Sequence, residues 1–476
     1  APAAPVSLDG EWELSYWPQP EKAVTDPAAL SGIEVKTIPA KVPGNVELDL
    51  LAAGLIDDPM IGANVNKLRA WEGNQWCYTR RFDAPKLEPG QRAELWFGGI
   101  DCLADVWVNG KHAGSSADML IERSFDVTDL IEQGGSNTVQ VIIRPVVLGA
   151  QDHLLGSFSM GNFATEESVY IRKAPHMYGW DIMPRLVSAG LWRGVELRTL
   201  NPARFTDVNW VTTHVDTASR NVSLFVDFQT RLPFDQYDKA KVRFTLTRDG
   251  KEAYRGEQVL FAHAGRIVVN LEKADLWWPR GYGEPALYEA KGELIGADGQ
   301  VLDTDVKRIG LRIVQLDLSD IHLPDERGKF CFIVNGEKIF VRGTNWVPLD
   351  ALHSRDAAQY ESAMKLVTDA NCNMVRCWGG NVYEDTRFFD LCDENGILVW
   401  QDFAMGCSFY PQRADFLDQL REEVTSVVWK LRNHPSLALW AGNNEDDANL
   451  FWSRLQPFHL DPNRDQVSRH VIPEVL

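Results

Sequence analysis

Residues 432–445 read Arg-Asn-His-Pro-Ser-Leu-Ala-Leu-Trp-Ala-Gly-Asn-Asn-Glu. The apolar run from Leu437 to Trp440 is typical of a buried strand, and two amides and the carboxylate of Glu445 follow it closely. In a (β/α) barrel the catalytic groups lie at the C-terminal ends of the parallel strands. Cleavage of a glycosidic bond requires such an acid beside the sugar. The stretch therefore predicts a barrel strand that delivers an acid to a sugar-cleaving site.

The segments before this stretch alternate between strand and helix patterns. We expect strands at 339–343, 374–378, 397–402 and 437–440, with helices at 357–370, 386–394 and 416–431. Apolar strands that alternate with helices predict a parallel sheet, and right-handed crossovers curl such a sheet into a barrel. A complete barrel needs roughly 250 residues, and the chain has little more than half of them after Ile339. Residues 316–476 are therefore expected to form the first half of a (β/α)8 TIM barrel.

Two all-β regions are expected before the barrel. Short alternating runs such as 93–97 and 104–108, with Asn109-Gly110 as a hairpin turn, predict a jelly-roll β-sandwich over residues 1–200. A second set of strands follows Asn201-Pro202 and predicts an immunoglobulin-like sandwich over 201–315. A linker is expected around 319–328. The predicted fold class is thus multidomain β plus α/β.

Composition restricts the classes of partner. The chain has 476 residues, 45% of them hydrophobic and 24% charged, as in soluble globular proteins with well-formed cores. Its net charge of −19 opposes binding to phosphate backbones or anionic lipid. No stretch approaches the roughly 20 apolar residues of a membrane helix. We therefore expect neither nucleic acid nor membrane as a partner.

The first residues, Ala-Pro-Ala-Ala-Pro, have no Met and no charged and apolar leader. We expect a periplasmic or secreted protein whose signal peptide has been removed, with a cytoplasmic location as the alternative. The seven cysteines show neither paired metal spacing nor a disulfide framework. They are expected to be mostly buried thiols, and a disulfide between Cys77 and Cys102 remains open. No metal or cofactor is predicted.

Polar or aromatic side chains occur at or just after all four expected barrel strands. In chain order they are Asn345 with Trp346, Arg376 with Trp378, Asp402, and Asn444 with Glu445. One acid after one strand would be weak evidence. Four such strand ends in succession predict a single site at the C-terminal edge of the sheet.

The fourth-strand motif resembles the acid/base strand of family 2 of the glycoside hydrolases. Its ending, Gly-Asn-Asn-Glu at 442–445, is similar to the β-mannosidase branch of that family. Leu-Asp-Gly-Glu-Trp at 8–12 and Trp-Val-Asn-Gly-Lys at 107–111 resemble the sugar-binding-type domain that opens these enzymes. Gly179-Trp180-Asp181, within 172–193, resembles the loop that the first domain sends into the pocket. The resemblance runs over essentially the whole chain.

This resemblance implies a role for each candidate residue. Glu445 would be the general acid/base, and Asn444 would donate to the sugar 2-hydroxyl. Arg376 would lie beside the nucleophile, Trp378 would form an aromatic wall, and Asp181 would bind hydroxyls. Asn345 and Trp346 are predicted to bind substrate, Asp402 to brace the pocket, and His434 to be structural. Two departures, Asn381 in place of Gly and Ile182-Met183-Pro184 in place of Trp-Gly-Pro, affect the residues that set specificity.

A retaining glycosidase uses two carboxylates roughly 5–5.5 Å apart. The resemblance places the nucleophilic Glu on a strand downstream of Glu445, and this chain does not contain it. We therefore expect an N-terminal portion of a longer enzyme, inactive by itself. The predicted enzyme is a retaining exo-glycoside hydrolase, most like β-mannosidase, that acts on an oligosaccharide or glycoside. The alternatives are a β-galactosidase, a β-glucuronidase, an exo-β-glucosaminidase or a non-catalytic carbohydrate-binding protein, and the oligomeric state is left open.

Overall fold

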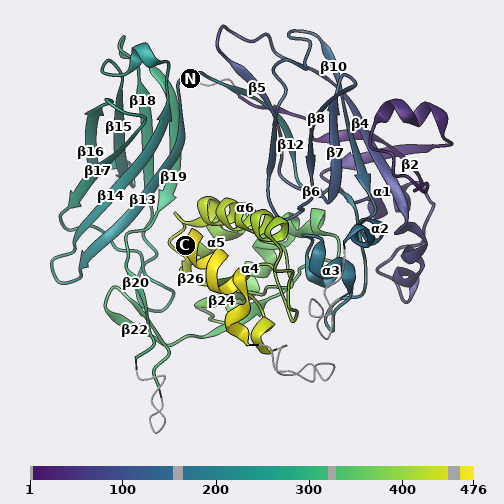
Figure 1. Ribbon diagram of the computed structural model, residues 1–476. Coiled ribbons are helices and arrows are strands. Elements are labelled where there is room, and N and C mark those ends of the chain that lie inside the picture. Colours follow the sequence, from purple (N-terminus) through teal and green to yellow (C-terminus); the bar gives the residue numbers. More distant parts are fainter. Residues whose placement is uncertain (1–3, 154–164, 320–327, 449–460) are drawn as a thin grey trace.

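The computed structural model describes residues 4–153, 165–319, 328–448 and 461–476. Most of the linker expected at 319–328 therefore lies outside the described residues. Two β-sandwiches flank a smaller α/β unit, which is drawn in green to yellow between them (Figure 1). The expected multidomain β plus α/β fold is confirmed.

The first sandwich packs two antiparallel sheets against each other, at the right of Figure 1. Val139, Val141 and Ile143 of β10 alternate along the strand and are buried in the core between the sheets, because successive side chains point to opposite faces. One sheet has the order β3 (Lys36–Val42), β2 (Gly10–Pro18), β4 (Asn74–Asp83), β10 (Ser136–Arg144), β7 (Leu103–Val108) and β8 (Lys111–Ser116). The other has the order β1 (Val6–Ser7), β12 (Val195–Leu200), β5 (Arg92–Phe97) and β9 (Arg123–Asp126). The remaining elements are the strand pair β6 (Ile100–Asp101) and β11 (Gly190–Leu191) and the helices α1 (Val46–Ala52), α2 (Val146–Gly149) and α3 (Glu166–Tyr170).

The second sandwich has a three-stranded and a four-stranded antiparallel sheet, as in an immunoglobulin-like fold. Val222, Leu224, Val226 and Phe228 of β14 alternate with more exposed residues and fill its core. The smaller sheet contains β13 (Arg204–Asp216), β14 (Asn221–Arg231) and β17 (Ala264–Leu271). The larger contains β16 (Lys251–Val259), β15 (Lys241–Arg248), β18 (Tyr288–Ile295) and β19 (Val301–Ile309).

The α/β unit contains a four-stranded parallel sheet, as expected for half of a barrel. An antiparallel meander of β20 (Val314–Asp317), β21 (Cys331–Val334) and β22 (Glu337–Ile339) precedes it. The parallel strands are β23 (Gly343–Trp346), β24 (Met374–Cys377), β25 (Leu398–Asp402) and β26 (Leu437–Ala441). They alternate with α4 (Tyr360–Asp369), α5 (Thr386–Asn395) and α6 (Ala414–Leu431), and α8 (Ile472–Val475) follows near the C-terminus.

The first parallel strand differs from the expectation. The sequence predicted it at 339–343, whereas β23 covers Gly343–Trp346. Ile339 instead ends the antiparallel strand β22 and pairs with Phe332. Only the two ends of the expected strand belong to sheets, Ile339 to β22 and Gly343 to β23, and an apolar run alone does not reveal which partner each part will find. As a result, Asn345 and Trp346 lie within the strand and not after it.

Two helices show local reasons for their bounds. The side chain of Asp385 accepts from the backbone N–H of Thr386 at the start of α5. The helix ends before Gly396, whose φ of 67° is left-handed and suits a residue without a Cβ. Helix α6 buries Phe416, Leu420 and Val424 at a spacing of four residues. The apolar stripe of α6 therefore faces the sheet and the first sandwich.

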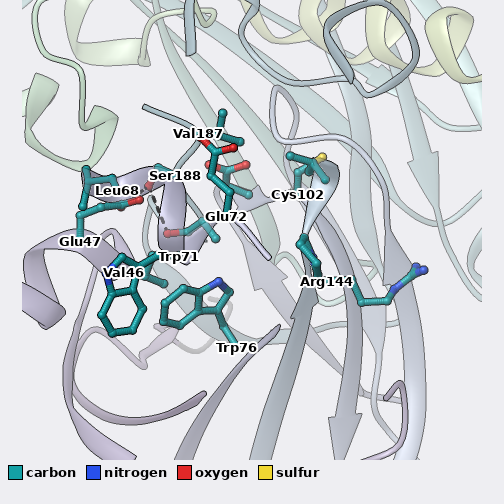
Figure 2. A pocket seen from close by; sticks show the side chains of 14 residues that line it. Val46, Glu47, Leu68, Trp71, Glu72, Trp76, Cys102, Arg144, Val187 and Ser188 are labelled. Atoms are coloured by element: carbon teal, nitrogen blue, oxygen red, sulfur yellow. Dashed lines mark hydrogen bonds between the residues drawn. The ribbon is translucent and has the colours of Figure 1, made fainter. Parts of the chain in front are cut away.

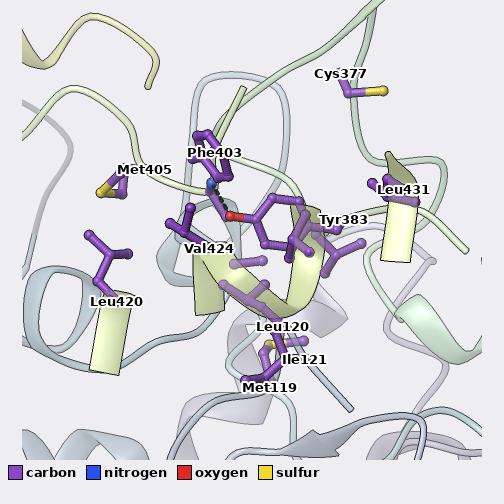
Figure 3. Close-up of a cluster of buried hydrophobic side chains, with 14 of the residues drawn as sticks. Met119, Leu120, Ile121, Cys377, Tyr383, Phe403, Met405, Leu420, Val424 and Leu431 are labelled. Atoms are coloured by element: carbon purple, nitrogen blue, oxygen red, sulfur yellow. Dashed lines mark hydrogen bonds between the residues drawn. The ribbon is translucent and has the colours of Figure 1, made fainter. Parts of the chain in front are cut away.

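One continuous hydrophobic core joins the first sandwich to the half barrel. Met119, Leu120 and Ile121 come from the sandwich and lie close to Tyr383, Phe403 and residues of α6 such as Leu420 and Val424 (Figure 3). Burial of apolar area on this scale resembles a domain interior more than a transient contact. We infer that the sandwich and the half barrel are fixed relative to each other.

The second sandwich holds the opposite end of the half barrel. The guanidinium of Arg312 donates to the carbonyls of Pro435 (3.0 Å) and Leu437 (2.6 Å), where β26 begins. The amide oxygen of Asn433 accepts from the backbone of Trp210 at 2.8 Å. His434 lies at this end, 2.6 Å from Asp393, away from the C-terminal ends of the strands. These contacts anchor the start of the strand that carries the fourth-strand motif.

Candidate active site

Arg376 lies on β24 and contacts residues from the other three strands of the parallel sheet near their C-terminal ends. It donates to Asn345 of β23 at 3.3 Å and to Asn444, just beyond β26, at 2.9 Å. It also contacts both carboxylate oxygens of Asp402 on β25, at 3.3 and 2.5 Å. Parallel strands in register end at one edge of the sheet, which is why residues almost 100 positions apart meet here.

Asp402 is buried and holds several groups in place. Besides Arg376 it accepts from the backbone N–H of Gly379 at 3.1 Å and from the indole of Trp400 at 3.0 Å. Burial raises the pKa of Asp402, while the adjacent Arg376 guanidinium acts in the opposite direction. The side chain is 1% exposed, so it braces the site without reaching the solvent side.

Glu445 lies next to a cysteine at the end of the fourth strand. The Cys407 thiol donates to Glu445 Oε2 at 3.4 Å, and the Asn444 amide donates to the Cys407 sulfur at 3.3 Å. Glu445 is exposed and has a left-handed φ of 60°. Such a backbone conformation is uncommon for a residue with a side chain and is concentrated at functional sites.

The next residue, Asp446, has a buried carboxyl group just beyond the end of β26. It is 6% exposed and accepts from the backbone N–H of Ser408 at 3.3 Å. Burial raises the pKa of Asp446 well above its usual range. The two adjacent acids therefore differ in environment, with Glu445 directed toward the open side and Asp446 toward the protein.

The loop after β25 is held from the first sandwich. Arg172 donates to the carbonyl of Ala404 at 2.8 Å and forms a fully buried, two-point ion pair with Glu423 of α6 at 2.6 and 2.9 Å. The hydroxyl of Tyr383 donates to Glu423 at 2.7 Å and accepts from the N–H of Ala404 at 2.9 Å. Both backbone groups of Ala404 are thereby fixed, and Cys407 follows three residues later.

The loop with Gly179-Trp180-Asp181 reaches the ends of the barrel strands. The backbone N–H of His176 donates to the carbonyl of Gly380 at 3.1 Å. The Trp180 ring lies edge-on to Trp378, with 5.1 Å between ring centroids. Asp181 is exposed and makes no hydrogen bond or ion pair with the residues that the structure describes. The loop thus brings one aromatic and one acidic side chain to the rim of the site.

Below these residues, the inner face of the sheet opens into a hollow of about 650 Å³. Its lining includes the polar residues Asn345 and Arg376 and the aromatic residues Phe332, Phe340 and Trp400. The side chain of Phe340 is 77% exposed. A hollow of this size is large enough for a sugar ring.

All three parts of the chain match models of one family. Residues 21–193 match the galactose-binding domain-like model of glycosyl hydrolase 2, residues 203–312 match glycosyl hydrolases family 2, and residues 327–465 match the TIM barrel domain of that family. The chain belongs to family 2 of the glycoside hydrolases. The fold is therefore that of a known group of enzymes.

Within family 2 the chain is similar to β-mannosidases. Beta-mannosidase B of Thermothelomyces thermophilus is 34% identical over 94% of this chain and 50% of its own length. The crystal structure of a β-D-mannosidase from Dictyoglomus thermophilum has a TM-score of 0.86 and 31% identity, and the match covers 99% of this chain and 56% of that one. An exo-chitosanase from Amycolatopsis orientalis, 19% identical with a TM-score of 0.65 over 91% of this chain and 49% of its own, shares the fold. The chain spans about half the length of the curated relatives it matches.

Of the predicted site residues, Trp346 does not join the cluster around Arg376. It is 5% exposed, packs on Phe388 of α5, and donates from its indole nitrogen to Glu384 at 2.8 Å. Successive residues of a strand point to opposite faces, so Asn345 faces the site and Trp346 faces the helices. The expectation that Trp346 contacts substrate is not supported by this position.

Sequence reasoning missed Cys407, Arg172 and Glu423. Cys407 could have been found, because it lies in the loop after a barrel strand, where TIM barrels place functional groups. Arg172 and Glu423 are 251 positions apart, and no local pattern indicates their pairing.

All seven cysteines are free thiols, which answers the open question about Cys77 and Cys102.

One group of potential metal ligands occurs among the described residues. Asp390, Asp393 and His434 bring ligand atoms within 4.8 Å of one another. Asp393 already accepts from His434 and from the backbone of Ser436, and Asp390 pairs with Arg308. We interpret the group as a structural network at the start of β26.

The first sandwich contains a small cavity lined by Glu47, Trp71, Trp76 and Ser188 (Figure 2). Its volume of about 20 Å³ holds about one water molecule and excludes a sugar. Burial raises the pKa of Glu47 to about 7, and Ser188 donates to its carboxylate at 2.6 Å.

No helix among the described residues is long and apolar enough to cross a membrane.

Proposed function

We propose that this chain forms the acid/base half of a retaining exo-β-mannosidase that releases terminal sugar from an oligosaccharide or glycoside. The observation that carries the proposal is the cluster of Asn345, Arg376, Asp402 and Asn444, with Glu445 beside it, at the ends of four successive parallel strands. The similarity to curated β-mannosidases favours mannose among the sugars that family 2 enzymes accept.

In this proposal Glu445 protonates the departing glycosidic oxygen, and its Oε1 atom makes no hydrogen bond with any described residue. Asn444 accepts from Arg376 and gives one N–H to Cys407, which leaves its second N–H for the sugar 2-hydroxyl. Arg376 would hold the nucleophile ionised, because a nearby cation favours a carboxylate. The Trp180 and Trp378 rings form the corner against which a sugar ring would pack.

The test is a screen of nitrophenyl β-glycosides with the protein made from its full reading frame. We expect the highest kcat/KM for the β-mannoside, and no release from residues 1–476 alone, because retaining hydrolysis needs both carboxylates. A preference for the β-galactoside, β-glucuronide or β-glucosaminide would assign a different member of family 2. Binding of sugar without turnover by the full-length protein would indicate a carbohydrate-binding function.

Asp181 tests whether the first sandwich contributes to specificity. If its carboxylate accepts hydrogen bonds from sugar hydroxyls, each such bond contributes roughly 1.5–3 kcal/mol, and Asp181→Ala should lower kcat/KM about 10- to 150-fold. The loss should be smaller for a glycoside that lacks the contacted hydroxyl. Asp129→Ala, at an exposed position of the same sandwich, is the control and should have no effect. Unchanged kcat/KM and unchanged preference among epimers in Asp181→Ala would exclude this role.

A further inference from the structure

A directed chain of hydrogen bonds leads from Arg376 to Glu445. Arg376 donates to the oxygen of the Asn444 amide at 2.9 Å, and the nitrogen of the same amide donates to the Cys407 sulfur at 3.3 Å. Because a guanidinium can only donate, it fixes which end of the amide faces it. The amide N–H groups must then face the sulfur.

The last hydrogen bond of this series runs from Cys407 Sγ to Glu445 Oε2 at 3.4 Å. The sulfur already accepts from Asn444, and a carboxyl oxygen that carries no proton can only accept, so the thiol proton points to Oε2 of Glu445. Burial, with a further contribution from Glu445, raises the pKa of Cys407 to about 12. The thiol therefore keeps the proton that it donates throughout the neutral range.

The backbone holds both ends of this contact. Cys407 N donates to the carbonyl of Asn444 at 2.7 Å, and Gly406 and Asn444 form a parallel bridge. Cys407 and Glu445 both have left-handed φ values, 52° and 60°. Residues with side chains keep such a conformation only where the surroundings fix it. The loop after β25 and the end of β26 are thereby locked together at the site.

We propose that Cys407 is a positioning residue for Glu445, and this rests on the acid/base role proposed above. The thiol holds Oε2, so that Oε1 faces the open side and delivers its proton to the departing oxygen. Arg376, through Asn444, sets the direction in which the thiol donates. Cys407 itself touches neither the sugar nor the reacting atoms.

The contact can be tested in residues 1–476 without any activity. Purified protein is treated with iodoacetamide, and mass spectrometry follows the alkylation rate of each cysteine. Glu445→Gln should accelerate alkylation at Cys407 several-fold, because the thiol ionises more readily without the carboxylate. The other six cysteines serve as internal standards. Asp447→Asn removes an acid two residues away, paired with Arg469, and should leave the rate unchanged. Equal rates at Cys407 in wild type and Glu445→Gln would overturn the proposal.

The role is tested in the full-length protein with glycosides of graded leaving-group ability. Cys407→Ala should lower kcat/KM about 3- to 10-fold more for poor than for good leaving groups, which is the effect of losing one modest hydrogen bond to the acid. Cys407→Ser should recover most of the loss, because a hydroxyl also donates. Cys407→Gly removes the donor without left-handed strain and should behave like Cys407→Ala. Cys372→Ala is the control.

Full activity in Cys407→Gly, or equal losses in the Ser and Ala variants, would overturn the positioning role. The proposed function fails in a different way, through the absence of glycoside hydrolysis by wild-type protein. The alkylation experiment separates the two, because it reports the contact between Cys407 and Glu445 whether or not the protein turns over substrate.

Discussion

Glu445→Gln in the full-length protein is expected to slow hydrolysis of glycosides with poor leaving groups by roughly 10²–10⁴-fold, the usual contribution of general acid catalysis. Glycosides with good leaving groups should be affected far less, because such groups depart without protonation. The measurement is kcat/KM over a series of aryl β-mannosides whose phenols differ in acidity. A steeper dependence on phenol acidity in the variant than in wild type identifies the missing acid.

Two controls sharpen this experiment. Azide should accelerate the Glu445→Gln variant with good leaving groups, because a small anion attacks the glycosyl intermediate without a general base. Asp447→Asn removes a carboxylate from the same segment, outside the cluster around Arg376, and should keep wild-type kinetics. Equal losses for all leaving groups, together with no response to azide, would show that Glu445 is not the acid/base.

Glu423→Gln is expected to destabilise the protein by about 3–5 kcal/mol, because it leaves a buried guanidinium without its counter-charge. The side chains of Arg172 and Glu423 are 1% and 0% exposed. Unfolding of residues 1–476 in urea, followed by tryptophan fluorescence, measures the change. The transition of the half barrel should move to a lower urea concentration. Arg172 and Tyr383 both donate to the Glu423 carboxylate, and both also hold the backbone of Ala404 in the loop after β25.

The matched control is an ion pair at the surface. Arg413 and Asp415 are 61% and 60% exposed, and Asp415→Asn should cost no more than about 1 kcal/mol. Replacing both members of the buried pair, as Arg172→Met with Glu423→Leu, should recover much of the lost stability, because no unpaired charge remains. A cost for Glu423→Gln no larger than that for Asp415→Asn would contradict the assigned role of the pair.

Local patterns in the sequence were sufficient to predict the three long helices of the α/β unit and the last three strands of its parallel sheet. Helix α5 was expected at 386–394 and is found at Thr386–Asn395, because an Asp cap and a left-handed Gly mark its two ends. Strand β26 and the polar residues after it were likewise predicted from an apolar run and its ending. Because parallel strands end at a common edge, the sequence also predicted that Arg376, Asp402 and Asn444 would meet.

Only the tertiary structure decided which face each residue occupies and which distant residues pair. Successive residues of a strand point to opposite faces, so within β23 Asn345 joins the cluster around Arg376, whereas Trp346 is buried against Phe388. The pairing of Arg172 with Glu423 and the contact of Cys407 with Glu445 depend on loops brought together from separate segments. Such contacts have no periodicity in the sequence, because they arise from the packing of whole elements and not from local preference.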